Sequence, residues 1–139
     1  MMHQVSWKIP RRGIQRFIPM LFDSENMSNT EDFEKMVDAY IDIFGNRWNI
    51  LIINEILIGS KRFNEIKHAL EPISQTVLVR HLRQLEDYGI LSRKVVCESP
   101  IEVRYSLTPE GVELYTPMLE SFKWIIRNIL EKDDGTMQT

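Results

Sequence analysis

The chain has 139 residues, a length that fits one domain with a tail at most. Apolar residues make up 43% of the chain and charged residues 27%, which excludes wholesale disorder, collagen and a coiled-coil fibre. The formal net charge of −3 argues mildly against a protein that coats nucleic acid through bulk charge. The single cysteine, Cys97, makes neither an internal disulfide nor a zinc site, so we expect a reducing, cytoplasmic environment.

The two ends of the chain differ in composition from its middle. Residues 1–30 combine two prolines, a basic cluster at Arg11 and Arg12 and a polar stretch, which predicts a flexible basic tail. Two other interpretations stay open: a start at Met27 with no natural coding sequence before it, and a basic arm that contacts DNA or a partner. We predict a folded domain over 31–132 and a disordered tail over 133–139. No apolar run approaches the roughly 18 residues of a membrane span, and a secretory signal pattern is lacking.

Apolar spacing and capping residues predict four helices, a β-hairpin and a last helical region. The hairpin consists of two partly alternating segments joined at Ser99-Pro100. The last helix opens at Thr108-Pro109, and we expect Pro117 to kink or split it. The expected helices cover 31–44, 46–57, 63–70 and 74–88, the strands cover 91–98 and 101–107, and the last helical region continues to about 131.

The helix expected over 74–88 has two different faces. Leu78, Leu82 and Leu85 form one apolar stripe, and Ser74 precedes it as an N-cap. The opposite face carries Thr76, Val79, Arg80 and Arg83, with Gln75 at its start. Glutamine and arginine match the edges of adenine and guanine, and a valine methyl packs on thymine. A short helix, a turn, this helix and a hairpin together have the layout of a winged helix-turn-helix, whose second helix enters the major groove.

Charge is distributed unevenly along the sequence. Residues 60–94 contain seven basic and four acidic side chains, a net charge of +3, whereas residues 31–59 and 95–139 each have a net charge of −4. The basic charge therefore coincides with the proposed reading segment, as attraction to phosphate requires. Lys61 and Arg62 before the short helix, and Arg93 and Lys94 in the hairpin, occupy natural positions for phosphate contacts.

Several motifs resemble those of the HxlR-type winged-helix transcriptional regulators. They are GNRWNILIINEIL, RFNEIKHALEPISQTVLVRHLRQLEDYGIL and VRYSLTPEG, spread over about 33–126. The resemblance implies a mainly α winged helix-turn-helix, in a prokaryotic cytoplasmic regulator that binds a pseudo-palindromic operator in double-stranded DNA as a homodimer. It implies an interface built by the first and last helices, at Phe33, Val37, Tyr40, Tyr115, Met118, Phe122 and Ile126. Together with the charge pattern it gives the candidate DNA-binding residues Lys61, Arg62, Ser74, Gln75, Thr76, Val79, Arg80, Arg83, Arg93, Lys94 and Arg104.

The sequence departs from the family in the wing, where the usual Arg-Val-Glu-Tyr is replaced by Glu102-Val103-Arg104-Tyr105. Either Arg104 takes the place of the usual arginine, or it points elsewhere and the wing is weaker. For Cys97 we favour an inert, half-buried thiol over a redox switch. His81 is expected to make a packing or phosphate contact. We predict no catalytic residue, metal site or cofactor, because no matching motif is present.

Two alternatives remain for function. A winged-helix scaffold that binds other proteins and never contacts DNA is the rival to a regulator, since a fold does not determine its function. The aromatic and methionine stripe of the last helix also suits a pocket for a small-molecule effector, although dimer packing is favoured. The sequence identifies no effector, no operator sequence and no direction of regulation.

Overall fold

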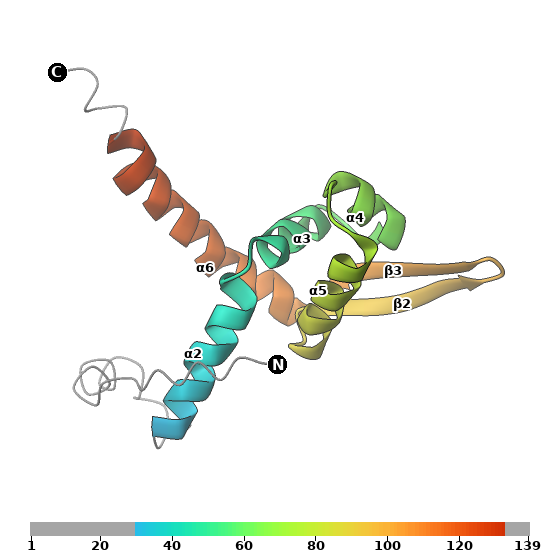
Figure 1. Ribbon diagram of the computed structural model, residues 1–139, viewed down its shortest axis with the longest axis horizontal. Helices are drawn as coiled ribbons and strands as arrows, with labels where there is room; N and C mark the ends of the chain where they lie inside the picture. The colour runs from blue at the N-terminus through green and yellow to red at the C-terminus, as the bar shows by residue number, and fades with distance from the viewer. Residues whose placement is uncertain (1–29, 133–139) are drawn as a thin grey trace. The chain divides into compact units, whose positions relative to one another are not determined.

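The computed structural model describes residues 30–132 and divides the chain into two units between residues 46 and 47. The first unit contributes helix α2 (Thr30–Phe44) (Figure 1). The predicted basic tail, apart from Thr30, and the predicted C-terminal tail lie outside the described residues. The second unit contains α3 (Arg47–Leu57), β1 (Lys61–Arg62), α4 (Phe63–Ala69), α5 (Gln75–Asp87), β2 (Leu91–Glu98), β3 (Ile101–Leu107), α6 (Pro109–Ile125) and the π-helix η1 (Ile126–Leu130). The predicted mainly α fold with one hairpin is thus confirmed.

Helix α2 ends as the sequence predicts, at a glycine. The backbone N–H of Gly45 donates to the carbonyl of Ile41 over 2.7 Å. A Cβ at Gly45 would lie against that same carbonyl oxygen, so the position requires glycine for space. Along the helix the rings of Tyr40 and Phe44, four residues apart, stack at 4.8 Å between centroids.

The core of the second unit forms around α5. Its predicted stripe of Leu78, Leu82 and Leu85 is fully buried, and α3 supplies Ile52 and Ile53 to the same core. Not all of the apolar side chains of α3 are buried, because Leu51 is exposed. Asn49 of the same helix is completely buried although its side chain is polar. A search for apolar spacing in the sequence does not find a buried residue of this kind.

Local signals set both ends of α5. The Oγ of Ser74 accepts a hydrogen bond from the backbone N–H of Val77 at 3.2 Å, so the predicted N-cap is confirmed. At the other end Gly89 has a φ of +74°, a left-handed conformation that glycine adopts without strain. The chain then turns at once into β2, where Leu91 enters the core.

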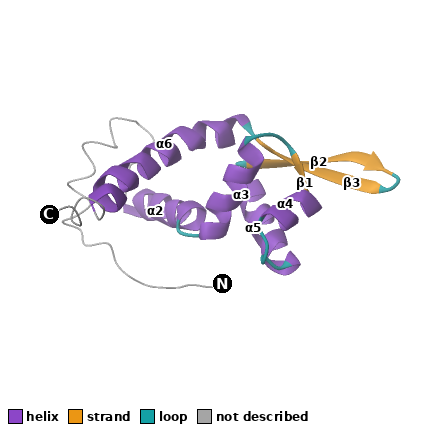
Figure 2. Ribbon diagram, turned by 90° about the horizontal axis from the view of Figure 1, so that it is seen from above, coloured by secondary structure: helices purple, strands orange, loops and turns teal. Residues whose placement is uncertain are grey.

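The hairpin has the predicted bounds and belongs to a three-stranded antiparallel sheet with the order β1-β3-β2. Strand β1 was not expected, because two residues are too few to show a strand pattern. The hairpin extends beyond the helices of its unit as a long wing (Figure 2). Its register pairs Arg93 with Tyr105 and Lys94 with Arg104, and an irregularity between Val95 and Cys97 shifts the pairing toward the tip.

Helix α6 begins as predicted, with the Oγ1 of Thr108 accepting from the backbone N–H of Gly111 at 3.0 Å. The predicted split at Pro117 is wrong, because α6 continues through this residue to Ile125. Proline deprives the carbonyl of Glu113 of a donor, but both residues are exposed, so water can satisfy it. The last helical region departs from α-helical geometry only after Ile125, in the π-helix η1. Among the helices of residues 30–132, none combines the length and apolarity needed to cross a membrane.

Candidate nucleic-acid interface

Helix α5 turns a polar surface outward because its apolar side is fixed in the core. Gln75, Thr76, Arg80 and Arg83 are exposed, and Val79 is half-buried between them. The predicted division of the helix into a packed and a solvent-facing side is therefore present. Gln75 and the two arginines carry the amide and guanidinium groups that recognise purine edges.

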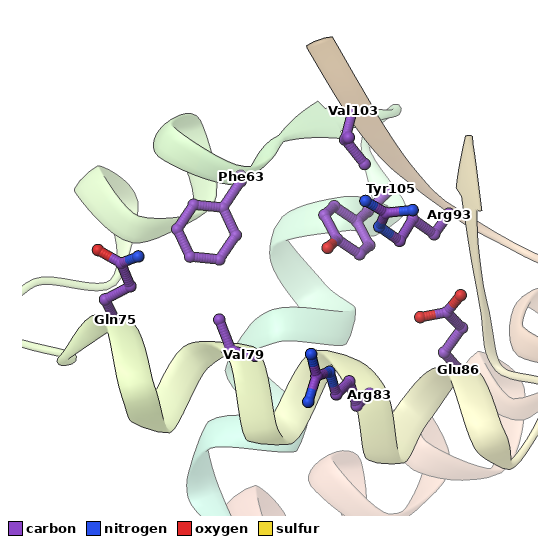
Figure 3. A pocket seen from close by; sticks show the side chains of 8 residues that line it. All are labelled: Phe63, Gln75, Val79, Arg83, Glu86, Arg93, Val103 and Tyr105. Carbon is purple, nitrogen blue, oxygen red and sulfur yellow. The ribbon is translucent and has the colours of Figure 1, made fainter. Parts of the chain in front are cut away.

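A groove of about 520 Å³ lies between α5, the start of α4 and the wing (Figure 3). Gln75, Val79 and Arg83 line it from α5, and Arg93 lines it from β2. The structure thus brings four predicted DNA-binding residues together. The remaining lining residues were not predicted as site residues and are Phe63, Glu86, Val103 and Tyr105.

The solvent-facing side of α5 is split into two neighbouring stripes. Gln75, Val79 and Arg83 recur every four residues and point into the groove, with Gln75 beside Phe63 of α4 (Figure 3). Thr76 and Arg80, one helical position further round, are exposed but do not line the groove. The sequence analysis placed Arg80 and Arg83 on one stripe. Arg83 lies eight residues after Gln75, a multiple of four, whereas Arg80 lies five residues after it. That difference in spacing could have separated the two arginines.

The wing presents different basic residues on its two faces. Residues directly opposite one another share a face of a sheet, so Arg93, Tyr105 and Lys61 lie on the face that borders the groove. Arg104 is paired with both Arg62 and Lys94, and these three lie on the opposite face. The basic residues predicted for the wing therefore lie on two opposite faces, of which only one borders the groove.

Two of the predicted DNA-binding residues make ion pairs within the chain. The Nε of Arg62 is 2.8 Å from the Oε1 of Glu102, and the Nε of Arg104 is 3.3 Å from the same oxygen. Arg104 also donates through Nη1 to the Oγ of Ser60 at 3.3 Å. These contacts hold the side chain of Arg104 at the base of the wing. That it takes the place of the usual wing arginine stays a prediction. Alternation along β3 indicates the Glu102–Arg104 contact, but no local pattern indicates Arg62.

A buried polar chain holds α5 to α3. The Oδ1 of Asn49 lies 2.9 Å from the Nδ1 of His81, and the Nδ2 of Asn49 donates to the Oε1 of Gln84 at 3.0 Å. Because the amide oxygen accepts, His81 carries its proton on Nδ1, which leaves the buried Nε2 without a partner among the described residues. Burial, and next the charge of Arg80, lowers the pKa of His81 below its ordinary value. His81 is thus a packing residue, one of the two roles expected for it.

The wing also carries the single cysteine of the chain. Cys97 is exposed, so the expectation of a half-buried thiol is wrong. It lies just past the irregular pairing of β2, where alternation no longer predicts a face. Within the described range, no cluster of three histidine, cysteine or acidic side chains is arranged to hold a metal ion.

The residues predicted for a dimer interface differ in exposure. Met118 is 2% exposed and Phe33 is 7% exposed, so burial within the chain leaves little of either side chain for a partner. Tyr40 and Ile126 are exposed, and Val37, Tyr115 and Phe122 are half-buried. Large exposed apolar side chains gather at the end of α6 and in η1, at Trp124, Ile125, Ile129 and Leu130.

Comparisons with known proteins agree with this architecture. The sequence model of the HxlR-like helix-turn-helix matches residues 43–133. The chain is 42% identical over 92 residues to the uncharacterized HTH-type transcriptional regulator YvaP of Bacillus subtilis, a match that covers 66% of this chain and 82% of that protein. It is 40% identical over 90 residues to the HTH-type transcriptional regulator YodB of the same organism, with 65% and 80% covered.

A solved structure extends the likeness to the fold. The reduced form of YodB from B. subtilis superposes with a TM-score of 0.63 at 36% identity, and the match covers 74% of this chain and 96% of that one. The chain therefore belongs to the HxlR-like helix-turn-helix family and is a transcriptional regulator of the winged-helix type.

Proposed function

We propose that the protein binds a pseudo-palindromic operator in double-stranded DNA as a homodimer. Helix α5 of each subunit enters the major groove, and the wing lies along the sugar-phosphate backbone. Gln75, Thr76, Val79, Arg80 and Arg83 contact bases and neighbouring phosphates. The backbone contacts come from Lys61, Arg62, Ser74, Arg93, Lys94 and Arg104.

The observation that carries this proposal is the groove beside α5. Its guanidinium groups, Arg83 and Arg93, come from the helix and from the wing, and neither makes an ion pair with a described residue. Glu86 also lines the groove, so two arginines and one carboxylate leave it a charge of +1, which favours a phosphate. The groove runs along the solvent-facing side of a helix that offers donors to base edges. A partner protein would have to bring an acidic side chain to this place, whereas every duplex carries phosphates.

The test is a selection of duplexes from a random library, followed by gel retardation with the selected sequence. The Arg80→Ala, Arg83→Ala double variant is expected to lose specific retardation. A second double variant, Lys123→Ala with Arg127→Ala, removes the same charge from α6 and η1 and is expected to retain it. Retained binding by the first variant would remove α5 from the interface. Failure of the unmodified protein to enrich any duplex would favour the protein-binding module.

The dimer part of the proposal rests on exposed apolar area. The end of α6 and η1 expose a run of large apolar side chains, and water-exposed patches of this kind mark contact surfaces. They are Trp124, Ile125, Ile126, Ile129 and Leu130. Ile126→Asp is expected to give monomers in light scattering. Val112→Asp alters an equally apolar, exposed residue at the other end of α6 and is expected to leave a dimer. An unchanged mass for Ile126→Asp would place the interface elsewhere.

A further inference from the structure

A carboxylate lies between two of the arginines at the base of the wing. The register places Arg62 of β1 directly opposite Arg104 of β3, so their guanidinium groups share one face of the sheet. Like charges opposite one another destabilise a sheet. The Oε1 of Glu102 is within 2.8 Å of one Nε and 3.3 Å of the other, and it relieves this repulsion. Arg62 has a second, more distant carboxylate, because the Oε1 of Glu65 lies 3.8 Å from its Nε. The two arginines and Glu102 together have a charge of +1 instead of +2.

This cluster is open to solvent and easily exchanged. The side chains are 52% exposed at Arg62, 33% at Arg104 and 26% at Glu102. Ion pairs at such exposure contribute about 0–1 kcal/mol, so an external anion displaces them at little cost. A guanidinium has five N–H donors, and the contacts of Arg104 with Glu102 and Ser60 use only its Nε and Nη1. Donors for a phosphate oxygen are therefore available.

We propose that Glu102 is an internal competitor of DNA phosphate for Arg62 and Arg104, and so holds down the affinity of the wing for duplex of any sequence. The inference rests on the proposed DNA-binding function. Non-specific affinity derives from neutralised phosphates and the counterions they release. A carboxylate that already neutralises half of the arginine charge reduces that contribution. Arg62 and Arg104 are proposed backbone contacts in the operator complex too, so Glu102 lowers the affinity for operator and for non-specific duplex alike.

Glu102→Gln is the decisive variant, because it keeps the shape and one accepting oxygen and removes only the charge. Glu98→Gln is the matched control, since it removes the same charge from an exposed position in the same hairpin, outside the arginine cluster. Binding to a mixed-sequence duplex is measured by fluorescence anisotropy at several salt concentrations. Each additional phosphate that the protein neutralises steepens the slope of log K against log[salt] by about 0.9.

We expect Arg62 and Arg104 to neutralise one or two more phosphates once the carboxylate charge is removed. The affinity of Glu102→Gln relative to the unmodified protein should be raised at low salt. That advantage should shrink by about 3.5-fold to 12-fold between roughly 50 and 200 mM salt. For Glu98→Gln the same ratio should stay nearly constant. Adding Arg62→Gln and Arg104→Gln to the Glu102→Gln background should abolish the increase in affinity.

Three results would overturn the inference. Equal behaviour of Glu102→Gln and Glu98→Gln would show that only net charge matters. Weaker binding by Glu102→Gln, with an unchanged thermal unfolding curve, would make Glu102 a residue that positions the arginines instead of competing for them. An increase in affinity that survives loss of both arginines would arise elsewhere. If the unmodified protein binds no duplex, the proposed function fails as well, whereas the first three results leave that function intact.

Discussion

Replacing Asn49 by alanine should destabilise the second unit strongly, although the residue lies on α3 and outside the groove. Asn49 is completely buried and bonds to His81 at 2.9 Å and to Gln84 at 3.0 Å. In Asn49→Ala the Nδ1–H of His81 loses its acceptor, and a buried unsatisfied group costs about 1–3 kcal/mol. Gln84 is half-buried and can turn to water, so its bond adds about 0.5–1.5 kcal/mol at most. The middle of each range gives a total loss of about 3 kcal/mol.

The assay is urea and thermal unfolding followed by circular dichroism. A domain of this size loses about 4–8 °C in Tm per kcal/mol, so Asn49→Ala should lower Tm by about 12–24 °C. Asn54→Ala is the matched control, because Asn54 is exposed on the same helix and gains the same helix propensity. It should be neutral or slightly stabilising. A difference below about 0.5 kcal/mol between the two variants would refute the reasoning, since ordinary surface substitutions fall in that range.

Other substitutions and pH test the remaining structural arguments. Gly111→Ala should lower Tm well below that of Gly59→Ala, because a Cβ at residue 111 collides with the backbone carbonyl of Ile90 and one at residue 59 meets open space. Thr108→Val removes the side-chain cap of α6 and should cost about 1 kcal/mol in urea unfolding. Burial lowers the pKa of His81 below 6.5, so the unfolded chain takes up its proton first. The free energy of unfolding should therefore be at its full value above about pH 6.5 and decline below it, and His81→Gln should flatten this decline.

Sequence alone was sufficient where the determining signals are local. The bounds of α5 follow from Ser74 and Gly89, and its buried side follows from leucines at a spacing of three and four. The wing follows from two β-branched segments around Ser99-Pro100. Each of these signals lies within one or two helical turns or one strand, so no partner segment has to be known.

Features that depend on distant segments were out of reach. Strand β1 exists because Lys61 and Arg62 pair with β3 more than forty residues later. The same pairing brings Arg62 to Glu102, so an arginine predicted to contact phosphate already has a partner within the chain. The groove likewise needs Phe63 and Tyr105 beside α5, and sequence analysis treated neither as a site residue. Charge counts locate a basic segment, but they do not say which arginines already have partners.

The two sides of α5 can be separated experimentally, because each affects binding in a different way. Arg83 belongs to the proposed contact surface, so its loss should reduce the number of phosphates neutralised and flatten the dependence of affinity on salt. Asn49 only fixes the position of the helix through His81 and Gln84. Its loss should weaken operator binding while the salt slope on mixed-sequence duplex stays unchanged. A parallel change in slope for both variants would mean that α5 does not act as a rigid element carried on the core.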